Sequence, residues 1–187
     1  MRTLVDTRAV VDHPCLVDQP PAPEVVADSG RRFATFPVAV LAFVIDPTDR
    51  RFLMFSAPAK RRRFAWEPVG GAVESGETLA SAVEREVSEE AGPNIQLSWL
   101  GTVHAGNFHY DHRVPNMISV AFVAEFLGGE IVASGDLAGC DVRWMDMGEI
   151  RAAASLGQLF PPEVGLFERA MTCFADWGDR AETSDQS

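Results

Sequence analysis

The chain has 187 residues, of which 47% are hydrophobic, and a formal net charge of -11. This length favours one domain with a substantial core and one active site. The acidic balance argues against a surface that neutralises a phosphate backbone, so nucleic acid is not expected as a partner. Small anionic ligands stay compatible with it, because a metal ion or a local basic loop reverses the sign of the charge.

Cysteine usage and the start of the chain indicate the compartment. Cys15, Cys140 and Cys173 are odd in number and far apart, so we expect buried thiols and neither a disulfide framework nor a zinc site. The first residues lack the apolar stretch of a signal peptide, and no run has the roughly eighteen apolar residues that a membrane span needs. We therefore expect a cytoplasmic protein without a membrane partner.

The chain is expected to have three parts. Residues 1–32 form a polar, proline-bearing N-terminal arm, residues 33–178 form the domain, and residues 179–187 form a disordered tail. The arm is suited to exchange between two copies of the chain, which leaves a homodimer open.

Within the domain, the apolar run PVAVLAFVI at 37–45 predicts a central strand. Asp46 and Pro47 then predict a turn into the partner strand RFLMFSA. Further strands are expected in LSWLGTVHA, MISVAFVAEF and DVRWMDM, and helices in GEIRAAASLG and PEVGLFERAMTCFADW. This order predicts an α/β fold in which helices cover both faces of a mixed sheet.

An acidic helix lies between these strands. At about 100° per residue, a helix that starts at Leu79 and ends before Gly92 has an apolar stripe that faces the core. Glu86 and Glu90 fall inside that stripe together with the apolar residues Leu79, Ala82, Val83 and Val87. Because an uncompensated buried carboxylate costs several kcal/mol, both glutamates need a partner.

Two kinds of partner are open. A basic side chain such as Arg85 pairs with the carboxylates, or the helix rotates them towards water. Alternatively, Glu86, Glu89 and Glu90 converge beside one helical turn and bind a divalent cation. Donor sets made only of oxygen select Mg²⁺, Mn²⁺ or Ca²⁺ over zinc.

The same residues belong to a longer pattern of fixed spacing. It reads G-x5-E-x7-R-E-U-x-E-E-x-G-U, with U aliphatic, and is filled by Gly71, Glu77, Arg85, Glu86, Val87, Glu89, Glu90 and Gly92. This pattern resembles the Nudix box, and the flanking strands resemble that family's strand order from about residue 36 to 154. Pro93 departs from the pattern at the last aliphatic position.

The resemblance implies a Nudix-type α/β/α sandwich and a hydrolase of nucleoside diphosphates linked to another moiety. It implies Mg²⁺ as cofactor, with Mn²⁺ as a substitute, bound by Glu86, Glu89, Glu90 and the carbonyl of Gly70. Arg85 and Glu77 resemble the pair that orients these glutamates. The group that takes the proton is left open between the box glutamates and a later carboxylate, Glu130 or Asp136.

Features outside the box bear on the substrate. Arg63, in the basic run KRRRFAW, is a candidate for phosphate binding, although a solvated loop is an equal alternative; Trp66 is expected to pack in the core. The stretch HAGNFHYDH is a minor candidate for zinc. It also contains Tyr110, seventeen residues beyond the box, where a tyrosine resembles that of diadenosine polyphosphate hydrolases in the family.

We therefore expect a pyrophosphohydrolase of a small nucleotide, with dinucleoside polyphosphates preferred over ADP-ribose-like or nucleoside triphosphate substrates. The alternative is a sensor or regulator of the same fold that binds nucleotides without cleaving them. Because every charged position of the box is filled, the enzyme is favoured. The zinc-finger and SQPWPFPxS array of the family's NADH-cleaving subgroup is not found in the sequence.

Overall fold

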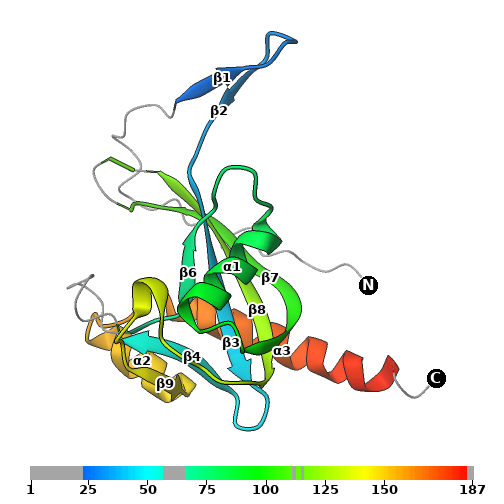
Figure 1. Ribbon diagram of the computed structural model, residues 1–187, viewed down its shortest axis with the longest axis vertical. Helices are drawn as coiled ribbons and strands as arrows, with labels where there is room; N and C mark the ends of the chain where they lie inside the picture. The colour runs from blue at the N-terminus through cyan, green and yellow to red at the C-terminus, as the bar shows by residue number, and fades with distance from the viewer. Residues whose placement is uncertain (1–22, 57–65, 111–112, 115, 185–187) are drawn as a thin grey trace.

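The structure is a computed structural model that describes residues 23–56, 66–110, 113–114 and 116–184. Figure 1 shows its elements. The strands are β1 (Glu24–Val26), β2 (Arg32–Ala34), β3 (Val38–Asp46), β4 (Arg51–Ser56), β5 (Trp66–Glu67), β6 (Val69–Ala72), β7 (Gln96–Phe108), β8 (Met117–Gly128) and β9 (Val142–Met145). The helices are α1 (Leu79–Glu90), the 3₁₀ helix η3 (Gly135–Leu137), α2 (Met147–Ser155) and α3 (Val164–Ser184).

In the described part of the chain, β3 is the centre of a seven-stranded mixed sheet. The strand order is β5-β4-β3-β8-β7, and β6 and β9 pair with β3 and β4 respectively. β3 runs parallel to β8, in register from Val38 with Ile118 to Ile45 with Glu125, whereas its pairings with β4 and β6 are antiparallel. The apolar run that predicted a central strand therefore forms one.

Helices cover both faces of this sheet. In Figure 1, α1 lies in front of the sheet and α3 lies behind it. Because side chains alternate along a strand, β3 contributes to two cores. Leu41, Phe43 and Ile45 pack with residues of α2 and α3. Val40, Ala42 and Val44 pack with residues of α1. The expected α/β fold, an α/β/α sandwich with a mixed central sheet, is confirmed.

The ends of α1 follow local rules. The hydroxyl of Thr78 accepts a hydrogen bond from the Ser81 amide at 3.1 Å, and the Ser81 side chain accepts one from the Thr78 amide in return. After the helix, Gly92 has a φ of 101°, as expected for the residue that ends it. One prediction is wrong: Leu79 is 39% exposed, because the first turn of α1 extends beyond the apolar core.

The other predicted elements form with shifted ends. The chain turns between β3 and β4, where the Asp46 side chain accepts a hydrogen bond from the Thr48 amide at 2.8 Å. β7, β8, β9, α2 and α3 lie where the sequence predicts strands and helices. α3 continues to Ser184, into the segment 179–187 that was expected to form a tail. Trp66 packs against the core beneath α2 and α3, as predicted.

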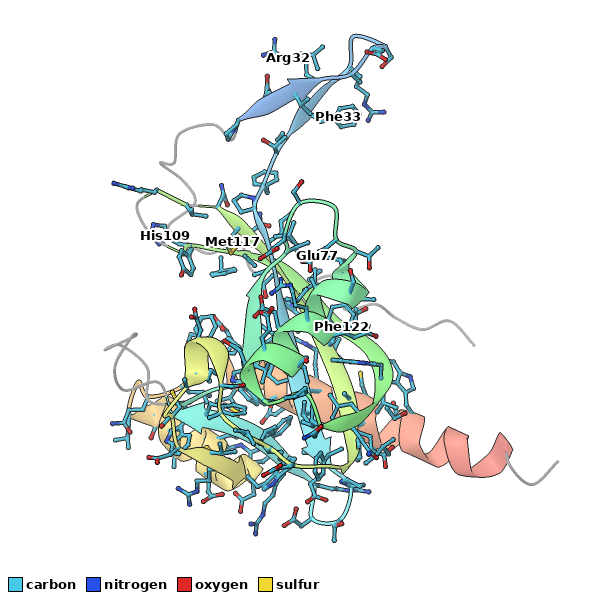
Figure 2. The ribbon with its side chains drawn as sticks, viewed as in Figure 1. Arg32, Phe33, Glu77, His109, Met117 and Phe122 are labelled. Carbon is cyan, nitrogen blue, oxygen red and sulfur yellow. The ribbon has the colours of Figure 1, made fainter. Side chains whose placement is uncertain are left out.

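β1 and β2 form a separate two-stranded ribbon that projects from the rest of the molecule (Figure 1). All six of its strand residues are exposed. Arg32 pairs with Glu24 across the ribbon, and the Arg31 guanidinium lies over the ring of Phe33. The sequence predicted an arm up to residue 32 but no strands in it. Figure 2 shows Arg32 and Phe33 at a distance from the other labelled residues.

Candidate active site

α1 turns two carboxylates towards the sheet. Glu86 and Glu90 are only 8% and 6% exposed. They share the buried stripe of α1 with Ala82, Val83 and Val87. The prediction that these acidic groups point inward is therefore confirmed.

The backbone of β6 receives both carboxylates. The Gly70 amide donates a hydrogen bond to Glu90 Oε2 at 3.0 Å. At Gly71, a Cβ atom would lie 2.2 Å from Glu86 Oε1, so no residue with a side chain fits unless Glu86 moves. Gly71 thus allows α1 to approach β6 so closely that a carboxylate meets the main chain, whereas the missing Cβ of Gly70 makes room for Val40 and Leu41 of β3.

Arg85 holds this arrangement together. Its guanidinium donates to Glu77 Oε1 at 2.7 Å, to Glu86 Oε1 at 2.9 Å and to Glu89 Oε2 at 3.1 Å. A further bond of 2.9 Å reaches the carbonyl of Ala72 in β6. Glu77 lies on the loop before α1, as Figure 2 shows. Arg85 therefore links the loop, the helix and the strand.

The electrostatics follow from these contacts. Burial raises the pKa of Glu86, and the hydrogen bond and charge of Arg85 oppose that rise. The same guanidinium lowers the pKa of Glu77, and Glu77 in turn raises the pKa of Arg85. Of the two alternatives for compensating the buried glutamates, pairing with Arg85 is present for Glu86.

The donor chemistry of this site also fits a hard divalent cation. Glu86, Glu89 and Glu90 offer only carboxylate oxygens, and the backbone of Gly70 lies beside Glu90. Across the described residues, no three acidic, histidine or cysteine side chains are already gathered as ligands around one point. Arg85 Nη1 lies between Glu86 and Glu89, so a cation would compete with this guanidinium for the same oxygens.

The later carboxylates, Asp136 and Glu130, lie in different parts of the fold. Asp136 lies on η3, which packs against the end of α1, where the Ser134 amide donates to the Glu90 carbonyl at 3.0 Å. Glu130 is exposed just after β8, beside the turn that contains Gly129. Arg63 falls outside the residues that the structure describes.

Sequence reasoning missed three residues near this site. Glu67 is buried in β5, two residues before Val69 and four before Gly71, and strand alternation puts all three on the α1 face. The alternation was visible in WEPVGG. The ring centroid of Phe108 is 6.4 Å from that of Tyr110 and 6.4 Å from that of Phe160. No sequence signal links Phe160 to this loop.

The remaining predictions concern cysteines, histidines and membranes. Cys140 and Cys173 form no disulfide bond within the described residues and are only partly buried. His104 lies beside Arg169, and the described residues contain no cluster that would support a zinc site. None of the described helices combines the length and apolar character that crossing a membrane requires.

The comparisons with known proteins agree with this geometry. The NUDIX domain family matches residues 35–162, more than half of the chain. Over 136 residues the chain is 28% identical to the NAD-capped RNA hydrolase NudC of Deinococcus radiodurans, covering 72% of this chain and 44% of that protein. It is also 28% identical over 113 residues to NudC of Pasteurella multocida, covering 60% and 40%. The chain thus spans less than half the length of these two relatives.

Solved structures share the fold. The MutT protein of Methanosarcina mazei superposes with a TM-score of 0.54 at 22% identity, covering 72% of this chain and 92% of that one. An ADP-ribose pyrophosphatase of Streptococcus suis gives a TM-score of 0.55 at 16% identity, covering 74% and 91%. At these identities the likeness concerns the arrangement of the sheet and helices.

Proposed function

Because the chain belongs to the NUDIX domain family, we propose that it is a Mg²⁺-dependent hydrolase of a pyrophosphate bond in a nucleoside diphosphate linked to another moiety. The observation that carries this proposal is the burial of Glu86 and Glu90 against the glycine backbone of β6. Buried carboxylates destabilise a fold unless a cation compensates them. Their burial at this position is therefore consistent with a functional role.

In this proposal, Glu86, Glu89 and Glu90 hold the metal together with the carbonyl of Gly70. The Gly70 amide donates to Glu90, and in an antiparallel strand the N–H and C=O of one residue point to the same side. This supports a carbonyl directed towards the same carboxylates. Mn²⁺ would suit the same oxygen donors. When bound, the metal lowers the pKa of a water molecule and offsets charge on phosphate oxygens.

The protein groups have separate tasks. Arg85 and Glu77 fix the position of Glu86, and the Gly70 amide fixes that of Glu90. Glu89 is exposed and accepts a hydrogen bond from Arg85, and besides its place among the metal ligands it is the box glutamate that we assign to take a proton from the attacking water. Of the two later carboxylates, Asp136 is the better alternative, since it lies on η3, which packs against α1.

The substrate is expected to contain an aromatic base. Tyr110 is 55% exposed and contacts Phe108 edge to face, so its ring is available to stack on a purine. We expect dinucleotides joined through a phosphate bridge to be cleaved better than ADP-ribose or nucleoside triphosphates. NudC proteins are named for an NAD-capped RNA, so the expectation that nucleic acid is no partner has no support from these relatives.

A hydrolysis panel tests this proposal. Diadenosine tetraphosphate, NAD, ADP-ribose, ATP and an NAD-capped RNA are incubated with Mg²⁺, with Mn²⁺ or with a chelator, in ¹⁸O-labelled water. We expect metal-dependent cleavage, with the label marking the phosphorus that is attacked. Nucleotide binding without turnover of any substrate would instead favour the sensor.

Tyr110→Ala tests the stacking. Loss of one base–aromatic contact is expected to raise the Michaelis constant for the preferred dinucleotide about tenfold, with little change in turnover. Steady-state kinetics measure both constants. An unchanged Michaelis constant would remove Tyr110 from the substrate site and leave the hydrolase proposal standing.

A further inference from the structure

One strip of the central sheet carries small side chains where a core would be expected. On the face covered by α2 and α3, Leu41 and Ala121 pair across β3 and β8 and are buried. Two residues earlier on the same strands, Ala39 and Ser119 also pair but are partly exposed. Two central strands are thus left partly uncovered at this end of the sheet.

The strip extends to both neighbouring strands. Ala72 of β6 pairs with Ala39, and Gly106 of β7 pairs with Ser119. All four residues are small, and none is buried. We call Ala39, Ala72, Gly106 and Ser119 the small-residue strip. The His104 imidazole lies over Gly106, since a Cβ there would come within 2.5 Å of His104 Nε2. Ala39, Ala72 and Ser119 carry only small side chains, so the uncovered part of the sheet lies on β3, β6 and β8.

Aromatic rings stand at one end of this strip. Phe108 follows Gly106 by two residues on the same face and pairs with Met117. Its ring contacts those of Tyr110 and Phe160, with its centroid 6.4 Å from each of theirs. Figure 2 shows Met117 and His109 at this end of β7 and β8, towards the projecting ribbon.

The backbone fixes Phe160 relative to the carboxylate site. Its amide donates to the Trp66 carbonyl at 2.9 Å, and the Trp66 amide donates to the Gln158 carbonyl at 3.2 Å. Trp66 begins the segment that leads within four residues to Gly70, whose amide binds Glu90. One continuous segment, from Trp66 to Gly70, therefore binds the backbone of Phe160 at one end and the Glu90 carboxylate at the other.

We propose that the base of the nucleotide substrate stacks on the row formed by Phe108 and Phe160, while its sugar and phosphates cross the small-residue strip towards Gly70. Phe160 then determines how much the base contributes to the affinity for the nucleotide. This inference rests on the proposed function, because it assigns another part of the same nucleotide. The ordinary alternative is that both rings only close the edge of the core.

Binding measurements separate these alternatives without requiring turnover. Adenosine 5′-diphosphate and ribose 5-diphosphate share the sugar and the phosphates and differ only in the base. In calorimetric titrations with Mg²⁺, we expect the wild-type protein to bind adenosine diphosphate at least about tenfold more tightly than ribose 5-diphosphate. Equal affinities for the two ligands, or no measurable binding of adenosine diphosphate, would overturn the proposal.

Variants then assign the effect to Phe160. Phe160→Ala and Phe160→Leu are expected to lower the affinity for adenosine diphosphate about tenfold and to leave the affinity for ribose 5-diphosphate unchanged. Phe160→Tyr keeps an aromatic ring and is expected to bind adenosine diphosphate as tightly as the wild type. The leucine variant keeps an apolar side chain, and the bonds to Trp66 use the backbone, so the fold is retained. Phe33→Ala, on the projecting ribbon, is the matched control.

The outcomes distinguish this inference from the proposed function. If Phe160→Leu lowers the affinity for both ligands equally, or for neither of them, Phe160 does not contact the base, even if the hydrolysis panel shows cleavage. If the panel shows no cleavage but the base-dependent loss appears, the base site stands and the hydrolase proposal fails. Circular dichroism and the unfolding midpoint of each variant confirm that binding is compared between folded proteins.

Discussion

The two faces of β3 are built differently. Towards α2 and α3, Phe43 meets Phe52 and Phe167 edge to face, with centroids 6.0 and 4.8 Å away. Towards α1, the apolar residues of β3 lie beside a helix that buries two carboxylates. One face is closed by apolar packing, whereas the other combines packing with charge.

This difference separates stability from function. Aromatic and aliphatic burial lowers the free energy of the folded state on either face. Burial of Glu86 and Glu90 raises the free energy of the folded state, even when Arg85 compensates part of the charge. The face towards α2 and α3 should therefore govern stability, and the α1 face should govern activity at some cost in stability.

Phe43→Ala should have the largest effect, because it leaves space at the centre of three fully buried rings. We expect the free energy of unfolding to fall by about 3 to 5 kcal/mol. Urea denaturation measures this change, and Phe33→Ala on the exposed ribbon should change it little. A loss below about 1 kcal/mol would show that this face does not dominate stability.

Glu90→Gln tests the α1 face, where we expect a loss of activity without a loss of stability. Glutamine keeps an oxygen that can accept the hydrogen bond from Gly70 but carries no charge. We expect hydrolysis to fall by about 100-fold or more, since loss of even an outer partner of a metal site typically costs 10- to 100-fold. The unfolding free energy without metal should stay equal or rise.

Glu84→Gln is the control for this variant, since Glu84 is exposed on the opposite side of α1. It should retain wild-type turnover and metal affinity. Full activity of Glu90→Gln would contradict the proposed role of the buried carboxylates.

Arg85→Ala should reduce turnover by about 10- to 100-fold while changing the Michaelis constant much less. Arg85 contacts Glu77, Glu86 and Glu89 and therefore positions ligands. Arg85→Lys keeps the charge without the planar set of donors, so it should recover stability better than turnover. An effect confined to the Michaelis constant would indicate that Arg85 binds the nucleotide.

Local patterns predicted much of this molecule. The helical stripe that contained Glu86 and Glu90 was visible because a period of 3.6 residues fixes which side chains share a face. β3 was visible as an apolar run, and the turn after it as Asp46 followed by Pro47. The spacing of the box brought Glu77 and Arg85 together before any contact was known.

Contacts between distant segments were not predictable in this way. Phe160 lies about fifty residues from Phe108 in the chain, and their contact depends on backbone bonds between Phe160 and Trp66. Leu79 satisfied the helical period but lies where the core ends. Strands β1 and β2 are only three residues each and have no buried residue, so no buried face marks them in the sequence.

The smallest expected effect concerns pH and belongs to the face towards α2 and α3. Burial lowers the pKa of His104 below its ordinary value of 6.5, and the positive charge of Arg169 lowers it further, while Glu163 opposes both. The unfolded chain therefore takes up a proton on His104 at a higher pH than the folded protein does. Its contribution to stability should be complete above about pH 6.5 and decrease as the pH falls from there towards the lower folded value.

Urea denaturation at about pH 7.5, 6.5 and 5.5 measures this decrease. His104→Gln should make the unfolding free energy fall less over that range, because glutamine takes up no proton. Arg169→Gln should give an intermediate slope, since burial is the larger cause and remains. If His104→Gln shows the same dependence of the unfolding free energy on pH as the wild type, the histidine is not held neutral by this face. The pH dependence then arises among the carboxylates of the α1 face instead.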